Sequence, residues 1–151
     1  MITPFLETAD DLSQLQLIDA EALKRALKKC DFKKELVRVR TGSEALELLR
    51  GQGDKTIESP YIIFLDINMP RMNGHEFLTE MRADSALKRN VVFILSSSTM
   101  EKDLSLAYDK NVAGFFRKPN SFAGFKEFID FVLRYSATNN FPPGAVAPLA
   151  E

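Results

Sequence analysis

The sequence predicts an α/β protein in which a parallel β-sheet is covered by helices on both faces. Three short apolar runs, each ending in polar residues, alternate with stretches whose apolar residues recur every three or four positions. A chain of 151 residues is long enough for one such domain and too short for two domains with separate cores. We therefore expect one domain over residues 1–137 and a flexible, proline-containing tail over residues 138–151.

The first part of the chain predicts a helix, a strand and a second helix. Apolar residues between Leu12 and Leu27 form the stripe of an amphipathic helix. The stretch Leu36–Arg40 alternates like a half-buried strand, and Thr41–Gly42 follows it as a turn. We expect Ser43 to cap the next helix, because a hydroxyl can accept a hydrogen bond from a backbone N–H in the first turn.

The rest of the chain predicts three buried strands. Continuous apolar runs at Tyr61–Asp66, Val91–Leu95 and Ala113–Phe116 are typical of parallel strands that are covered on both faces. Helical periodicity follows each run, over residues 75–83, 99–109 and 122–135. Strands and helices in this order require right-handed crossovers and a doubly wound sheet.

Charge and composition exclude several classes of protein. Lysine and arginine number 20 against 21 acidic residues, which argues against direct nucleic-acid binding or attachment to a membrane surface. The longest apolar run, Tyr61–Leu65, is far shorter than the roughly 20 residues that span a bilayer. The single cysteine, Cys30, cannot form an internal disulfide, and the first residues do not resemble a signal peptide, so we expect a cytoplasmic protein.

Polar side chains follow all three apolar strands and form the candidate site. They are Asp66, Ser96–Ser98 and Lys118, and the carboxyl ends of parallel strands meet at one edge of a sheet. A carboxylate beside a cation and hydroxyls can attack phosphorus to give an acyl phosphate, with a divalent metal offsetting the added charge. Polar residues also end strands simply because loops are polar. From the residues alone, a phosphorylation site and an ordinary polar loop are about equally well supported.

A family resemblance favours phosphorylation. The segment Phe64–Gly74, with its Met69–Pro70 pair, resembles the phosphoacceptor loop of response-regulator receiver domains. The spacings from Asp66 to Ser96 and to Lys118 are those usual in the family. The resemblance spans about residues 36–135 and is closest to single-domain receivers that end in a pattern like Lys118–Phe122.

The resemblance implies a fold and a role for each residue. The fold would be flavodoxin-like, (βα)5, with a five-stranded sheet in the order 2-1-3-4-5. Asp66 would be the phosphoacceptor, Ser96 the hydroxyl that follows the phosphoryl group, and Lys118 its counter-ion. Phe115 would be the aromatic switch, and the backbone of Asn68 would bind Mg²⁺. The phosphodonor would be a histidine kinase or a histidine phosphotransfer protein.

The first strand and its metal ligands are the point at which the sequence departs from the family. Receivers end this strand with two adjacent acidic residues, and an ungapped alignment puts Gln14 and Leu15 there. The acidic pair Asp10 and Asp11 lies earlier, but using it would make residues 4–8 the central strand, for which they look poorly suited. Asp10 and Asp11 thus stay candidate ligands, and we favour a weak or altered magnesium site.

Three functions from different classes are compatible with these patterns. We expect a stand-alone receiver, not an enzyme, that signals to a downstream protein. Its signalling surface would consist of the helix over residues 99–109, the strand at Ala113–Phe116 and the helix over residues 122–135. The sequence does not decide whether the protein forms a homodimer. The alternative is a pseudo-receiver that acts without phosphorylation. An aspartate-nucleophile phosphatase of the haloacid dehalogenase type fits less well, because its general acid would be at Asn68. We expect His75 at a solvated helix position and Cys30 as an inert thiol.

Overall fold

A five-stranded parallel sheet forms the centre of the protein, with the strands in the order β2-β1-β3-β4-β5. The computed structural model describes residues 5–8, 36–39, 41–54, 57, 61–67, 72–97, 100–119 and 122–142. The predicted α/β fold and strand order are confirmed. The strands are β1 (Phe5–Thr8), β2 (Leu36–Val39), β3 (Ile62–Leu65), β4 (Val91–Ser96) and β5 (Gly114–Arg117).

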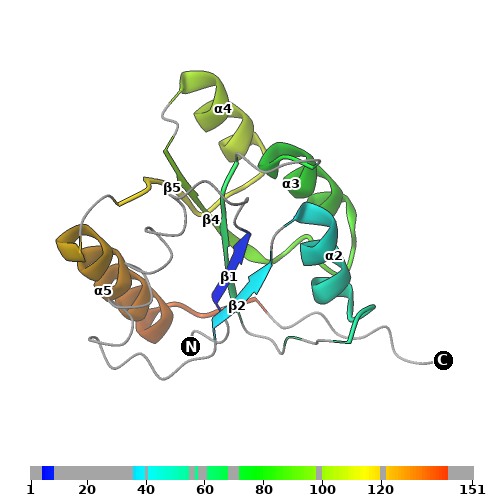
Figure 1. Ribbon diagram of the computed structural model, residues 1–151, viewed down its shortest axis with the longest axis horizontal. Coiled ribbons are helices and arrows are strands. Elements are labelled where there is room, and N and C mark those ends of the chain that lie inside the picture. Colours follow the sequence, from blue (N-terminus) through cyan, green and yellow to red (C-terminus); the bar gives the residue numbers. More distant parts are fainter. Residues whose placement is uncertain are drawn as a thin grey trace.

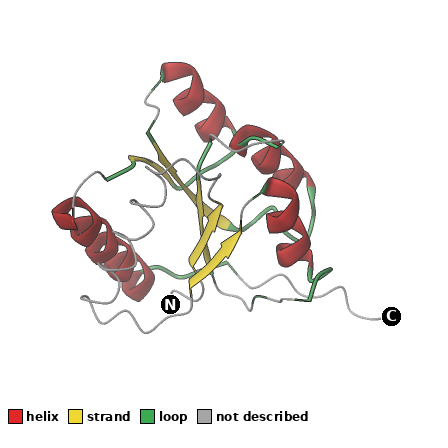
Figure 2. Ribbon diagram, in the orientation of Figure 1, coloured by secondary structure: helices red, strands yellow, loops and turns green. Residues whose placement is uncertain are grey.

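Helices cover both faces of this sheet (Figures 1 and 2). One face carries α5 (Phe122–Thr138), and the other carries α2 (Gly42–Arg50), α3 (Gly74–Ala83) and α4 (Glu101–Asp109). Over the described residues, no helix is both long and apolar enough to cross a membrane. The expected helices after β3, β4 and β5 are thus present, with bounds within three residues of those predicted.

The strands β3, β4 and β5 each contribute side chains to two separate hydrophobic clusters, as alternation along a strand requires. In β3, Ile63 and Leu65 belong to the cluster beneath α2, α3 and α4. Ile62 and Phe64 belong to the cluster beneath α5, where the Phe64 and Phe128 rings meet edge to face at 5.1 Å. All four β3 side chains are almost fully buried, which explains why this strand reads as a continuous apolar run.

The central strand β1 corrects one expectation from the sequence. Residues Phe5–Thr8 pair in parallel with β2 on one side and β3 on the other, so this segment does form the central strand. The first strand therefore ends at Thr8 and not at Gln14 and Leu15. The ungapped alignment was wrong because it assumed a fixed length of chain between strand and helix. Residues 9–35, including the predicted first helix, lie outside the described residues.

The cap of α2 is a second correction. Thr41, not Ser43, is the N-cap: its hydroxyl accepts a hydrogen bond of 3.1 Å from the backbone N–H of Glu44. The helix begins at Gly42, two positions earlier than a cap at Ser43 would place it. Both residues have a hydroxyl, and only the backbone path decides which one meets the free N–H groups.

Gly74 closes the loop that follows β3 and must be a glycine for reasons of space. Its N–H donates to the carbonyl of Ile67 over 2.9 Å, which brings the start of α3 back against the end of β3. A Cβ atom at Gly74 would lie 2.7 Å from the Ile67 Cα and 2.9 Å from the Asp66 carbonyl oxygen. Backbone atoms cannot rotate out of the way as a flexible side chain can, so this contact sets the position of α3 relative to Asp66.

We predict that Gly74→Ala lowers the free energy of unfolding by about 2–3 kcal/mol, the range of a substitution that overfills a tight site. Gly53→Ala is the matched control, because a Cβ there meets nothing within 4 Å. It should change stability by less than about 0.5 kcal/mol. Urea unfolding of both variants checks this, and equal stabilities would contradict the steric role of Gly74.

Candidate functional site

A carboxylate and an ammonium group meet at the carboxyl edge of the sheet. Asp66 follows β3 directly, and only 8% of it is exposed. Lys118 follows β5, and its Nζ lies 3.6 Å from Asp66 Oδ2. Burying a carboxylate in an apolar environment is costly unless an opposite charge or hydrogen bonds compensate. The ammonium group of Lys118 supplies that charge.

Ser96 lies at the same edge, between these two residues in the strand order. It is the last residue of β4 and is completely buried. Its carbonyl accepts a hydrogen bond of 2.8 Å from the backbone N–H of Lys118. The two residues are therefore held together by the main chain, and a shift of the β4 end also moves the segment that carries Lys118.

The two aromatic residues of β5 face different clusters. Phe115 is half-buried and packs against the cluster that contains Ala107 of α4 and Val112 from the turn after it. Phe116 packs against the cluster beneath α5, where its ring meets that of Phe128 at 5.6 Å. The expected switch residue Phe115 thus lies on the α4 side of the sheet.

Several expected metal ligands lie outside the described residues: Asn68, Asp10 and Asp11. Within the described part of the chain, no three metal-binding side chains come together. The register nonetheless pairs Thr8, the last residue of β1, with Leu65, which immediately precedes Asp66. The chain therefore leaves β1 beside Asp66, whose carboxylate oxygen is the type of ligand that Mg²⁺ prefers.

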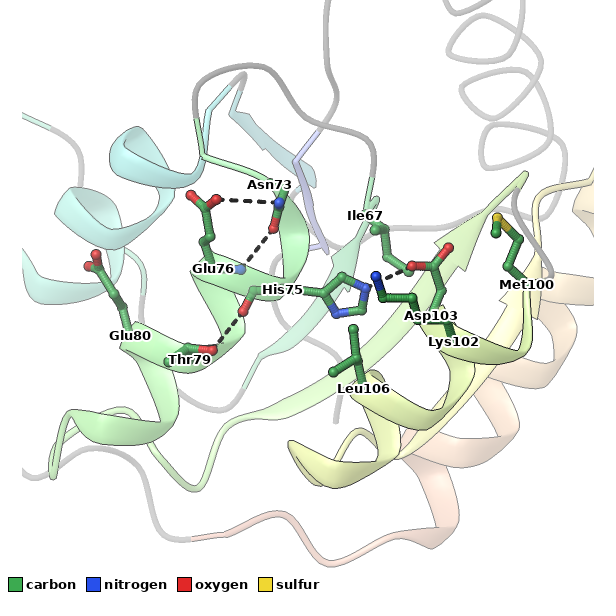
Figure 3. A pocket seen from close by; sticks show the side chains of 10 residues that line it. All are labelled: Ile67, Asn73, His75, Glu76, Thr79, Glu80, Met100, Lys102, Asp103 and Leu106. Atoms are coloured by element: carbon green, nitrogen blue, oxygen red, sulfur yellow. Dashed lines mark hydrogen bonds and ion pairs between the residues drawn. The ribbon is translucent and has the colours of Figure 1, made fainter.

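His75 is not at a solvated position, which corrects the sequence-based expectation. Its Nε2 lies 3.0 Å from Oδ1 of Asp103 in α4, and about a fifth of each side chain is exposed. The pair lines a cavity of about 770 Å³ between α3 and α4, with Ile67 at one end (Figure 3). Sequence analysis could not find this pair, because nothing in the spacing of the two residues indicates that their helices pack side by side. Cys30 lies outside the described residues.

Comparison with known proteins identifies the family. A family model for the response regulator receiver domain matches residues 16–130. The chain belongs to the receiver-domain family. The match begins after β1, so the structure rather than the family pattern locates the first strand.

The similar proteins extend over most of this receiver's length. A probable methanogenesis regulatory protein, FilR2 of Methanothrix harundinacea, is 29% identical over 92% of each chain. The phosphorylated cyanobacterial phytochrome response regulator RcpA has a TM-score of 0.80 at 28% identity, over 95% of this chain and 100% of its own. The Mn²⁺-bound response regulator Rcp1 of Synechocystis has a TM-score of 0.76 at 27% identity, over 93% and 99%.

We predict that Lys118→Met lowers the free energy of unfolding by about 2 kcal/mol, because the buried Asp66 carboxylate loses its ammonium partner. The loss should be smaller than the ~3–5 kcal/mol of a fully buried pair, since both side chains keep some exposure. Arg117→Met is the control: Arg117 is the preceding residue of β5 and is exposed. Urea unfolding at neutral pH measures both, and an equal effect would show that the Asp66–Lys118 pair is energetically unimportant.

Proposed function

We propose that this receiver accepts a phosphoryl group on Asp66 from a histidine kinase or a histidine phosphotransfer protein. The observation that carries the proposal is the contact of 3.6 Å between the buried Asp66 carboxylate and Lys118. RcpA was crystallised in its phosphorylated form, and this likeness supports the same chemistry here. The protein would then be a signalling component and not an enzyme that acts on other molecules.

In the proposed phosphoryl transfer, one bond to phosphorus forms at Asp66 and one breaks in the donor. A carboxylate oxygen of Asp66 attacks phosphorus, an O–P bond forms, and the N–P bond of the donor phosphohistidine breaks as its imidazole leaves. Lys118 lies where its charge stabilises the negative phosphoryl oxygens, and its small ammonium group suits a single oxygen. The Ser96 hydroxyl, fixed at the end of β4, would donate to another of these oxygens.

Mg²⁺ is the cofactor we propose for this step. Asp66, the backbone carbonyl of Asn68, and Asp10 with Asp11 would hold it, and when bound it would offset charge on the phosphoryl group. The Mn²⁺-bound form of Rcp1 supports a divalent cation here. With β1 ending at Thr8, the two acidic residues follow the central strand after a single intervening alanine.

The output would be a protein contact on the surface made by α4, β5 and α5. Phe115 connects the site to α4, since it lies three residues before Lys118 and packs on the cluster that includes Ala107. Exposed Phe131 on α5 and Tyr108 on α4 offer apolar area to a partner. A difference of a few kcal/mol in phosphate contacts is enough to shift such a surface between two states.

A pseudo-receiver that acts without phosphorylation is the second candidate. The observation that favours it is Ala9: the residue directly after β1 is not acidic, so the adjacent acids Asp10 and Asp11 come after the strand end and not at it. The two candidates differ in whether metal and phosphoryl group bind.

We predict that incubation with acetyl phosphate and Mg²⁺ adds one phosphoryl group to the wild-type protein and none to Asp66→Asn. Intact-mass spectrometry measures this. Asp109→Asn, an exposed residue at the end of α4, is the control and should be phosphorylated like wild type. A mass gain that persists in Asp66→Asn would disprove the assignment, and no gain in wild type would favour the pseudo-receiver.

We also predict that Asp10→Asn with Asp11→Asn weakens Mg²⁺ binding at least tenfold and abolishes phosphorylation. The reason is that carboxylate oxygens contribute most of the charge that holds this cation. Amide shifts of Asp66 during a Mg²⁺ titration give the affinity, and Asp54→Asn, in an exposed loop, is the control. Equal affinity in the double variant and wild type would show that neither acid is a ligand.

A further inference from the structure

One hydrogen bond joins the amino-terminal ends of α3 and α4. His75 is the second residue of α3, and its ring points across to Asp103 in the first turn of α4 (Figure 3). The atoms His75 Nε2 and Asp103 Oδ1 are 3.0 Å apart. Because an ionised carboxylate only accepts hydrogen bonds, Nε2 carries the hydrogen. The bond can therefore form whether the imidazole is neutral or charged.

The opposite end of α4 is held much more firmly, by Arg82 of α3. The guanidinium group donates to the carbonyls of Lys110 and Asn111, over 2.7 and 3.0 Å, directly after the last helical residue of α4. It also donates to the carbonyls of Lys88 and Asn90, over 2.6 and 2.8 Å, in the connection before β4. The Arg82 side chain thus links the carboxyl end of α4 to the segment that precedes β4.

Between these two ends, α4 has little packing. Ala107 is its single buried residue, whereas Tyr108 is 53% exposed. The N-cap is Met100, which is 65% exposed and whose side chain makes no capping hydrogen bond. The position of α4 therefore depends on its two attachments more than on a hydrophobic interface.

The attachment at His75 is also easier to release than the one at Arg82. Within the described residues, Nδ1 of His75 is buried and has no hydrogen-bond partner. A buried polar atom without a partner loses its hydration, and that cost offsets part of the gain from the Nε2 bond. Opening the contact would expose both nitrogens to water, so the bond between His75 and Asp103 adds only a small net energy to what holds this end of α4.

Both partners of the bond are linked to the phosphorylation site by short segments of chain. His75 follows Gly74, whose N–H is hydrogen-bonded to Ile67 next to Asp66. Asp103 lies seven residues after the buried Ser96 at the end of β4. The hydrogen bond thus connects the two loops that leave the site, and a change in the distance between those loops acts on it directly.

We propose that His75 and Asp103 form a latch that holds the amino-terminal end of α4 against α3, and that phosphorylation of Asp66 opens it. When the latch opens, α4 pivots about the carboxyl end that Arg82 fixes, and the surface made by α4, β5 and α5 changes. The regulatory part rests on the proposed function, whereas the latch itself exists in the unphosphorylated protein. His75 is a positioning residue here and takes no part in phosphoryl transfer.

Hydrogen exchange of the unphosphorylated protein tests the latch. In His75→Ala, the amides of Leu104 and Ser105 in α4 should exchange about tenfold faster than in wild type, which corresponds to losing one hydrogen bond of ~1.4 kcal/mol. The amides of Lys110 and Asn111, next to the Arg82 attachment, should change less than about twofold.

Further variants separate the latch from a general loss of packing. His75→Gln keeps an N–H near the position of Nε2 and should restore slow exchange. Glu80→Ala, an exposed position on α3, should leave exchange unchanged. Asp103→Ala should accelerate exchange less in the His75→Ala background than in the wild-type background, because the shared bond can be lost only once. Unchanged exchange in His75→Ala, no rescue by glutamine, or additive effects in the double variant would each overturn the proposal.

A second measurement tests the link to phosphorylation. After treatment with acetyl phosphate and Mg²⁺, Leu104 and Ser105 of wild type should exchange at the rate of His75→Ala, and that variant should show no further increase. If mass spectrometry shows a phosphoryl group and wild-type exchange stays slow, the regulatory role is wrong. If no phosphoryl group is added, the proposed function fails and the regulatory role fails with it, while the exchange of the untreated variants still decides whether the latch exists.

Discussion

The charge of Asp66 is the constraint on which the rest of the site depends. The carboxylate follows a strand whose four side chains are almost fully buried, and water reaches little of it. It is tolerated because Lys118 extends from the end of β5 to within 3.6 Å. That contact requires β3, β4 and β5 to be neighbours in this order, with Ser96 between the two charges. The edge suits a phosphoryl group on electrostatic grounds, because it combines a carboxylate with a positive charge held beside it.

The two faces of the sheet are built differently, and this difference suits a signalling protein. Beneath α5, aromatic rings interlock: Phe93 alone meets the rings of Phe116, Phe131 and Tyr135. On the other face, α4 contributes only Ala107 to the core and relies on hydrogen bonds at its ends. Elements with few buried contacts open at low energetic cost, so α4 is the part of the described structure most able to change position without loss of the fold.

The sequence predicted β2 and, more clearly, the three buried strands β3, β4 and β5 with the polar residues that follow them. Each of these three is a continuous apolar run, and each is followed by the polar residue that the fold places at the edge. β1 carried no such signal. Its residues Glu7 and Thr8 are polar and interrupt any apolar run, so its place between β2 and β3 came only from the backbone pairing. The cap of α2 at Thr41 was misplaced for a similar reason, since Ser43, two residues further along the chain, is an equally good capping residue.

By itself, the sequence determined the fold class, the strand order through the family resemblance, and the candidates Asp66, Ser96 and Lys118. These follow from local properties: hydrophobic runs, helical periods and polar residues at strand ends. Only the tertiary structure decided the distance between Asp66 and Lys118, the position of β1, and the contact of His75 with Asp103. Each of these joins segments far apart in the chain, and side-chain contacts across a fold depend on how layers pack, which no local pattern records.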